Sequence, residues 1–193
     1  MLLPCCKSRK KNCPLINSDL VEVRAAVDFF SRSKFDEEVD RLLSKAESSI
    51  PCETLPDLPY MENAPGVPAW YGFEFEVWNA GEEIRQLVFA SKKRFHKNQT
   101  DRILAVCLNK NAGRGRQSFV MLLGQRKYCD CAGVLIPLLD DADVNGHVIE
   151  AVYKMRAKGY TAMIAPFLNH KQAWIRNAAK KYVQRFAESE SAD

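Results

Sequence analysis

The sequence predicts an all-α fold, a right-handed α-solenoid of helix hairpins with a proline-rich insertion at about residues 49–78. Apolar residues recur at helical spacing along most of the chain, which indicates amphipathic helices. Segments with a common layout begin at Cys107, Leu138 and Phe167, at intervals of 31 and 29 residues, as in stacked repeats. Five of the nine prolines fall within residues 49–69, where they exclude a regular helix.

Length and composition fit one soluble domain. The chain has 193 residues, of which 47% are hydrophobic and 27% are charged, so it can form a core of its own. No apolar run approaches the roughly 20 residues of a membrane helix, and residues 1–4 are too short for a secretory signal. We expect a cytoplasmic protein without stable membrane insertion. Its domain at 14–188 lies between a basic, cysteine-containing tail at 1–13 and a disordered tail at 189–193.

Two helical patterns precede the insertion. The apolar residues between Leu20 and Phe30 recur at i, i+3, i+7 and i+10, and a second stripe runs from Phe35 to Ala46. Asp19 has the position of a helix N-cap. Only a few residues separate the two stripes, which predicts an antiparallel helix hairpin.

The insertion ends in an aromatic segment, from Trp70 to Trp78. Phe73, Phe75 and Val77 alternate as in a strand, but the sequence offers no second strand for pairing. We therefore expect an extended stretch or a short helix packed by its aromatic side chains.

Helices are expected to resume after the aromatic segment. Asn79 has the spacing of an N-cap before a stripe that contains Ile84, and Thr100 has the same relation to Ile103. Cys107 lies within this second apolar pattern, which predicts a small core residue.

The three repeated segments share more than their spacing. Pro137 and Pro166 each stand one residue before a segment, and nine positions after each start come Arg116, His147 and Arg176. Two short helices joined by turns and repeated every thirty-odd residues predict a solenoid, because neighbouring hairpins complete a shared core.

These residues resemble HEAT-like repeats. The clearest stretch is Ile164–His170 followed by Ile175–Ala179, a polar turn before an aliphatic-Arg-x-Ala-Ala run. The similarity covers residues 100–188 well and 14–47 fairly, and residues 48–78 depart from it. The middle repeat is degenerate, since Gly146 and His147 replace the aliphatic-Arg pair. The resemblance implies that the repeat arginines bond to the turn of an adjacent repeat, although they also suit ligand contacts.

Charge is distributed unevenly. Residues 1–13 carry the whole net charge of +4. Residues 14–63, the acidic front, have a net charge of −6, and residues 85–127, the basic middle, have a net charge of +10. Such asymmetry steers partners of opposite sign. Solvated helix faces alone produce the same pattern, and we prefer that interpretation.

The sequence offers little for catalysis or metal binding. Its histidines, His96, His147 and His170, form no His-Glu-x-x-His pattern, and its seven cysteines form no paired Cys-x-x-Cys motifs. The glycine-rich stretch at 111–116 lacks the Gly-Lys-Ser/Thr ending of a phosphate loop, which favours a wide turn. We expect no enzyme, no cofactor and no metal site.

The tail has two interpretations. Cys5 and Cys6 stand beside a polybasic run, as in dual-acylation membrane anchors. A basic tail with incidental cysteines has the same composition and is preferred here.

The favoured function is binding of another protein, as an adaptor or an inhibitor. Solenoids present extended curved surfaces, and small HEAT-like proteins resemble adaptors and immunity proteins that neutralise a bacterial toxin. The acidic front fits a basic partner, and the aromatic segment either supplies anchors or seals the end of the solenoid. The predicted contact residues are Trp70, Tyr71, Trp78, Arg85, Lys92, Lys93, Arg94, Arg114, Arg116, His147 and Trp174.

Nucleic-acid binding through residues 85–127 is the alternative, since some HEAT-like proteins, among them alkylpurine DNA glycosylases, grip DNA. Phosphate contacts along this stretch predict binding that weakens steeply with salt. The neutral charge of the remaining body argues against it. A HEAT-like hydroxylase is set aside, because the sequence lacks repeated His-Glu metal pairs.

Overall fold

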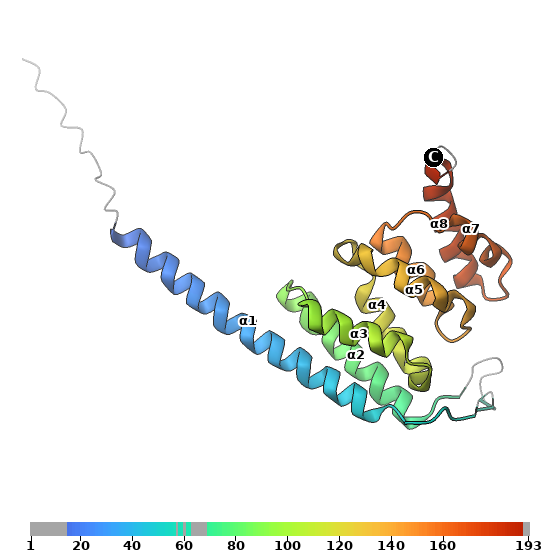
Figure 1. The fold of residues 1–193 in the computed structure, drawn as a ribbon, viewed down its shortest axis with the longest axis horizontal. Helices are drawn as coiled ribbons and strands as arrows, with labels where there is room; N and C mark the ends of the chain where they lie inside the picture. Colours follow the sequence, from blue (N-terminus) through green and yellow to red (C-terminus); the bar gives the residue numbers. More distant parts are fainter. Residues whose placement is uncertain (1–14, 57, 60, 63–68, 191–193) are drawn as a thin grey trace, which may run out of the picture.

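All regular secondary structure in the described part of the chain is helical (Figure 1). The computed structural model describes residues 15–56, 58–59, 61–62 and 69–190, with side-chain surroundings between residues 31 and 187. These ranges contain no strand, which confirms the all-α prediction. Cys5, Cys6 and the rest of the tail at 1–13 lie outside the described residues, as do Pro65 and Pro68 of the insertion and residues 191–193.

Eight α-helices and four short 3₁₀ segments make up the described ranges. The α-helices are α1 (Leu15–Ser49), α2 (Gly72–Ser91), α3 (Lys97–Leu108), α4 (Gln117–Leu123), α5 (Ala132–Leu135), α6 (Asn145–Met155), α7 (Thr161–Ile164) and α8 (Ala173–Glu190). The 3₁₀ segments are η1 (Lys110–Arg116), η2 (Arg126–Cys131), η3 (Ile136–Asp140) and η4 (Ala165–Asn169). In none of these helices do length and apolar character together suffice for crossing a bilayer.

A single long helix replaces the predicted hairpin before the insertion. Helix α1 is continuous through residues 31–34, so the expectation of two helices with a first cap at Asp19 is wrong. This stretch contains no glycine or proline, and a bond between side chains one turn apart supports the helix there. Arg32 Nε donates to the Asp36 carboxylate at 2.8 Å. The first half of α1 therefore extends away from the other helices (Figure 1).

The aromatic segment is not the extended stretch or short separate helix expected there: Trp70 and Tyr71 precede α2, and the rest of the segment forms the first turns of this 20-residue helix. Its N-cap is Tyr71, whose N–H donates to the Glu74 carboxylate at 2.7 Å, while the Glu74 N–H donates to the Tyr71 carbonyl at 3.1 Å. Asn79 lies inside α2, so the helix start expected there is wrong. Thr100 likewise lies inside α3, because His96 caps that helix with its imidazole.

The helices pack in two rows (Figure 1). Helices α2, α4, α6 and α8 contact one another in chain order, and α1, α3 and α5 contact one another in a second row. Leu43, Ile84, Phe119, Leu123 and Ile149 are fully buried in one continuous core. Cys107 is also fully buried in α3, as predicted, and burial raises the pKa of its thiol.

The connections between paired helices gather along one edge of the molecule. They are the described residues of 50–71 (50–56, 58–59, 61–62 and 69–71) and the segments 109–116, 140–145 and 169–173, and we call this edge the turn edge (Figure 1). Pro137 and Pro166 take equivalent places near the starts of η3 and η4, where a residue without an N–H is tolerated. Helix α8 continues to Glu190, two residues past the predicted end of the domain.

Candidate functional site

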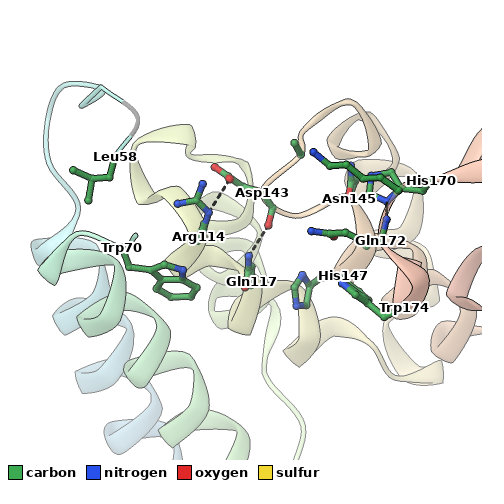
Figure 2. A pocket seen from close by; sticks show the side chains of 13 residues that line it. Leu58, Trp70, Arg114, Gln117, Asp143, Asn145, His147, His170, Gln172 and Trp174 are labelled. Carbon is green, nitrogen blue, oxygen red and sulfur yellow. Dashed lines mark hydrogen bonds and ion pairs between the residues drawn. The ribbon is translucent and has the colours of Figure 1, made fainter. Parts of the chain in front are cut away.

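A pocket of about 740 Å³ opens on the turn edge. Leu58 and Trp70 from the segment before α2 line one side, and Trp174 at the start of α8 lines the other (Figure 2). Arg114 and His147 lie between them (Figure 2). Because these side chains come from the segment before α2, from η1, from α6 and from α8, the pocket depends on the packing of several helices.

The floor of the pocket is a set of interlocked polar groups. Arg114 Nε pairs with the Asp143 carboxylate at 3.1 Å, and its Nη1 donates to the Ala69 carbonyl at 3.0 Å. Gln117 Nε2 donates to the Asp143 carbonyl at 2.6 Å (Figure 2). Burial raises the pKa of Asp143 although Arg114 opposes the shift. These bonds connect the segment before α2 with segment 109–116, and they connect segment 109–116 and the start of α4 with segment 140–145.

Glu74 supports this floor from beneath. Its buried carboxylate accepts the Arg114 N–H at 2.6 Å as well as the Tyr71 N–H. A Cβ at Gly113 would lie 2.1 Å from a Glu74 oxygen, and the φ of Gly113 is +53°. Glycine is therefore required at this position, both for the backbone conformation and for the close approach.

Arg116 lies below the surface, with 2% of its side chain exposed. Its Nη2 donates to the Asp141 carboxylate at 2.6 Å, and its Nε donates to the Gly113 carbonyl at 2.8 Å. The expected bond from a repeat arginine to the adjacent turn is thus confirmed here. The prediction that Arg116 contacts a partner is wrong, because its buried guanidinium cannot reach another molecule. Arg176 differs, since it bonds to carbonyls of its own turn.

Trp174 and His147 form the aromatic wall. Their ring centroids are 5.1 Å apart at an interplanar angle of 59°, and 44% of Trp174 is exposed. A Cβ at Gly146 would lie 2.1 Å from the Trp174 ring, so the ring rests on bare backbone. The Gly146-His147 pair that departs from the repeat pattern therefore creates the seat for Trp174.

Two polar atoms of the pocket residues are buried without a partner in the described part of the chain. They are Nδ1 of His147 and Oδ1 of Asn145, a residue with 6% exposure. Burial lowers the pKa of His147, which favours its neutral form at pH 7. An unmade buried hydrogen bond costs about 1–3 kcal/mol.

The other predicted contact residues lie elsewhere. Tyr71 lines a neighbouring cavity of about 190 Å³, and its hydroxyl donates to the Pro56 carbonyl at 2.8 Å. Trp78 is half-buried in α2 and lines none of the described pockets. Arg85 and Lys92 line a separate groove at the far end of α2.

The basic middle of the sequence does not form one unpaired stripe. Five of its eleven bases pair with carboxylates: Arg85, Lys97, Arg102, Arg114 and Arg116. Arg102 bonds to Asp40 at 3.2 Å and to Glu47 at 2.7 Å, both on α1. Through Arg102, part of the acidic front is thus neutralised by the basic middle within the molecule.

Lys93 and Arg94 differ from each other. Lys93 Nζ bonds to Ser31 of α1, at 2.7 Å from its hydroxyl, and lies 5.6 Å from the Phe35 ring centroid. Arg94 is exposed. Lys93 therefore helps to hold α1 against the end of α2, and Arg94 remains accessible to a partner.

Several pocket residues were not predicted from the sequence, namely Leu58, Gln117, Asp143, Asn145, His170, Lys171 and Gln172. Most belong to turns that follow the repeated segments at 138 and 167. Because the repeat spacing alone would place such turns on a common edge, this spacing is the sequence signal from which these pocket residues could have been predicted.

The described residues contain no cluster of three or more His, Cys, Asp or Glu side chains suited to a metal ion. No family model matches the chain, and neither the curated proteins nor the solved structures include a match to it.

Proposed function

We propose that this chain is a non-catalytic α-solenoid of HEAT-like hairpins that binds another protein through the turn-edge pocket. The contacts among α2, α4, α6 and α8 in chain order support a solenoid, because each hairpin then packs mainly on its neighbours. The equivalent positions of Pro137 and Pro166 support the repeat. The right-handed sense belongs to the same proposal.

The observation that carries the binding function is the convergence of four predicted contact residues on one pocket. Trp70, Arg114, His147 and Trp174 come from segments far apart in the sequence and line the same pocket. Tryptophan and arginine are frequent hot spots in protein interfaces, above all where a pocket encloses them.

The chemistry of the pocket suits a polypeptide segment. Two indole rings offer apolar surface, and the exposed Lys171 and Gln172 side chains of the lining can donate hydrogen bonds to a peptide backbone. Arg114 is already paired with Asp143, so strong net charge contributes little to recognition. The same pairing favours binding over catalysis, because Asp143 serves to hold the floor.

An inhibitor is our preferred form of this function, such as a cytoplasmic immunity protein that neutralises a bacterial toxin. Exposed acids on and after α1, including Glu37 and Glu53, suit a basic partner such as a nuclease. Asp40 and Glu47 are already engaged by Arg102, so only part of the acidic front remains for that role.

The test is affinity capture with the full chain as bait, from nuclease-treated lysate of its own organism, at low and high salt. The baits are the wild type, Trp174→Ala and Met163→Ala. Met163 is a matched control because it is 54% exposed on α7 and lines none of the described pockets. We expect one protein in near-equal amount on the wild type and on Met163→Ala, and its loss from Trp174→Ala. The proposal is contradicted if Trp174→Ala captures as much of the protein as the wild type does, or if the wild type captures no protein.

The nucleic-acid alternative is less favoured for the whole of residues 85–127. A glycosylase-like grip needs many bases free for phosphates. The ion pairs of Arg85, Lys97, Arg102, Arg114 and Arg116 remove nearly half of them.

A further inference from the structure

A second surface lies at the C-terminal end of α2, where Phe89 is 85% exposed. Arg85 lies one turn before Phe89 on the helix, and Lys92 is the left-handed cap that follows the helix three residues after Phe89. With Gln125 and Lys127 from the connection after α4, these residues line a groove of about 430 Å³. We call it the Phe89 groove.

Cations dominate this groove and its surroundings. Lys92, Arg94, Arg126 and Lys127 form no ion pair with a carboxylate among the described residues, whereas Arg85 pairs with Glu82. Burial first, and then the neighbouring Arg94, lower the pKa of Lys127. The charges of Arg94 and Lys127 are therefore close enough to repel each other, and a bound anion would relieve this repulsion.

The groove is a fixed feature of the fold. Lys127 Nζ donates to the Lys93 carbonyl at 3.2 Å, which holds the connection after α4 against the end of α2. Lys92 is the αL cap of α2, and its N–H donates to the Val88 carbonyl at 2.8 Å. The connection that carries Lys127 and the backbone of Lys92 are thus held in place before any ligand arrives.

Phe89 has no evident part in the core. The buried residues at this end of α2 are Ile84 and Val88, and the Phe89 ring projects beyond them into solvent. An apolar side chain of a partner prefers an enclosed pocket, whereas a projecting ring offers a flat face for stacking. Together, a projecting ring and flanking unpaired cations match the two halves of a nucleotide, the base and the phosphate.

We propose that the Phe89 groove binds single-stranded nucleic acid, with a base stacked on Phe89 and phosphates against Lys92, Lys127 and Arg94. This site differs from the turn-edge pocket in position and in ligand. Helix α2 has 20 residues and therefore spans about 30 Å, which separates the two surfaces.

The test is fluorescence anisotropy of a labelled oligothymidine of about 12 nucleotides, a length within the range of single-strand binding sites, titrated with the full chain. We expect binding that weakens with salt. Phe89→Ala should lower the affinity about tenfold, as for loss of one stacked base. Lys92→Gln and Lys127→Gln should each lower the slope of log affinity against log salt by about 0.7.

Two controls separate this site from general attraction. Lys181→Gln removes one exposed charge on α8, and Trp174→Ala removes an exposed indole from the turn-edge pocket. Both should bind the oligonucleotide like the wild type. The basic tail is present in every variant, so a dependence on Phe89 cannot come from it.

Three results would overturn the proposal. The first is no binding by the wild type, and the second is equal binding by Phe89→Ala. The third result concerns binding of a labelled glutamate-rich peptide that contains one phenylalanine. If that peptide binds in a Phe89-dependent way and the oligonucleotide does not, the groove is a site for acidic protein segments.

Discussion

The two ends of α2 combine aromatic and charged side chains in opposite ways. At the start of the helix, Glu74 and Arg114 are bonded within the protein, and tryptophans line a pocket. At the other end, Phe89 projects into solvent and Lys92 has no carboxylate partner in the described part of the chain. Charges at the first end hold turns together, so recognition there depends on shape and hydrogen bonds. At the second end, Lys92 and Arg94 are exposed and have no carboxylate partner among the described residues, so these two charges are available to a ligand.

The largest expected effect of a substitution is on the stability of the turn edge. Arg116→Met should lower the free energy of unfolding by about 3–5 kcal/mol, because it leaves the Asp141 carboxylate without its buried partner. Lys92→Met, at the other end of α2, should change it by no more than about 0.5 kcal/mol. Urea denaturation followed by circular dichroism measures both. If both variants lost the same free energy of unfolding, the charges at the two ends of α2 would not differ in their structural role.

The seat of Trp174 gives the next effect. Gly146→Ala should cost about 1–3 kcal/mol, because the new methyl group displaces the indole and Ile175. The tryptophan emission should also shift to longer wavelength. Gly133→Ala is a matched control in α5, where the nearest atom to the added carbon is 3.4 Å away. An unchanged emission spectrum in Gly146→Ala would show that the indole does not rest on this glycine.

The burial of His147 gives a smaller, pH-dependent effect. Its folded-state pKa is lowered from 6.5, so between the two pKa values the unfolded chain binds a proton that the folded chain does not. Stability should therefore fall as the pH falls below about 7 toward 5. Unfolding measured across this range should show a weaker dependence in His147→Gln. His170→Gln keeps His147 and should follow the wild type, and the opposite ranking would contradict the assignment.

The smallest expected effect on stability is at the Phe89 groove. Phe89→Ala should change the free energy of unfolding by no more than about 0.5 kcal/mol, because the ring is already in solvent. Thermal denaturation checks this value. A loss of several kcal/mol would mean that the ring is part of the core.

The helical class and some roles were predictable because they depend on local patterns. The burial of Cys107 follows from its place in an apolar stripe, and the bond from Arg116 to the next turn follows from the repeat. The apolar stripe changes at residues 31–34, and this change predicts a turn, yet α1 continues because no residue there breaks a helix. The solenoid itself stays a prediction.

Other features depend on contacts that sequence spacing does not encode. The cap of α2 depends on the Glu74 carboxylate behind an aromatic N-cap, and the ion pairs of Arg102 depend on the docking of α1. The exposure of Phe89 could be predicted from the sequence, because this apolar residue lies outside the buried stripe of its helix and has Arg85 and Lys92 as neighbours.

The most direct test is a titration of the captured partner, once purified, against the wild type, Trp174→Ala and Phe89→Ala. Trp174→Ala should weaken binding by about 30-fold or more, as expected for an interface hot spot of 2 kcal/mol, and Phe89→Ala should bind like the wild type. If Phe89→Ala loses the partner while Trp174→Ala keeps it, the turn-edge pocket is not the protein-binding site.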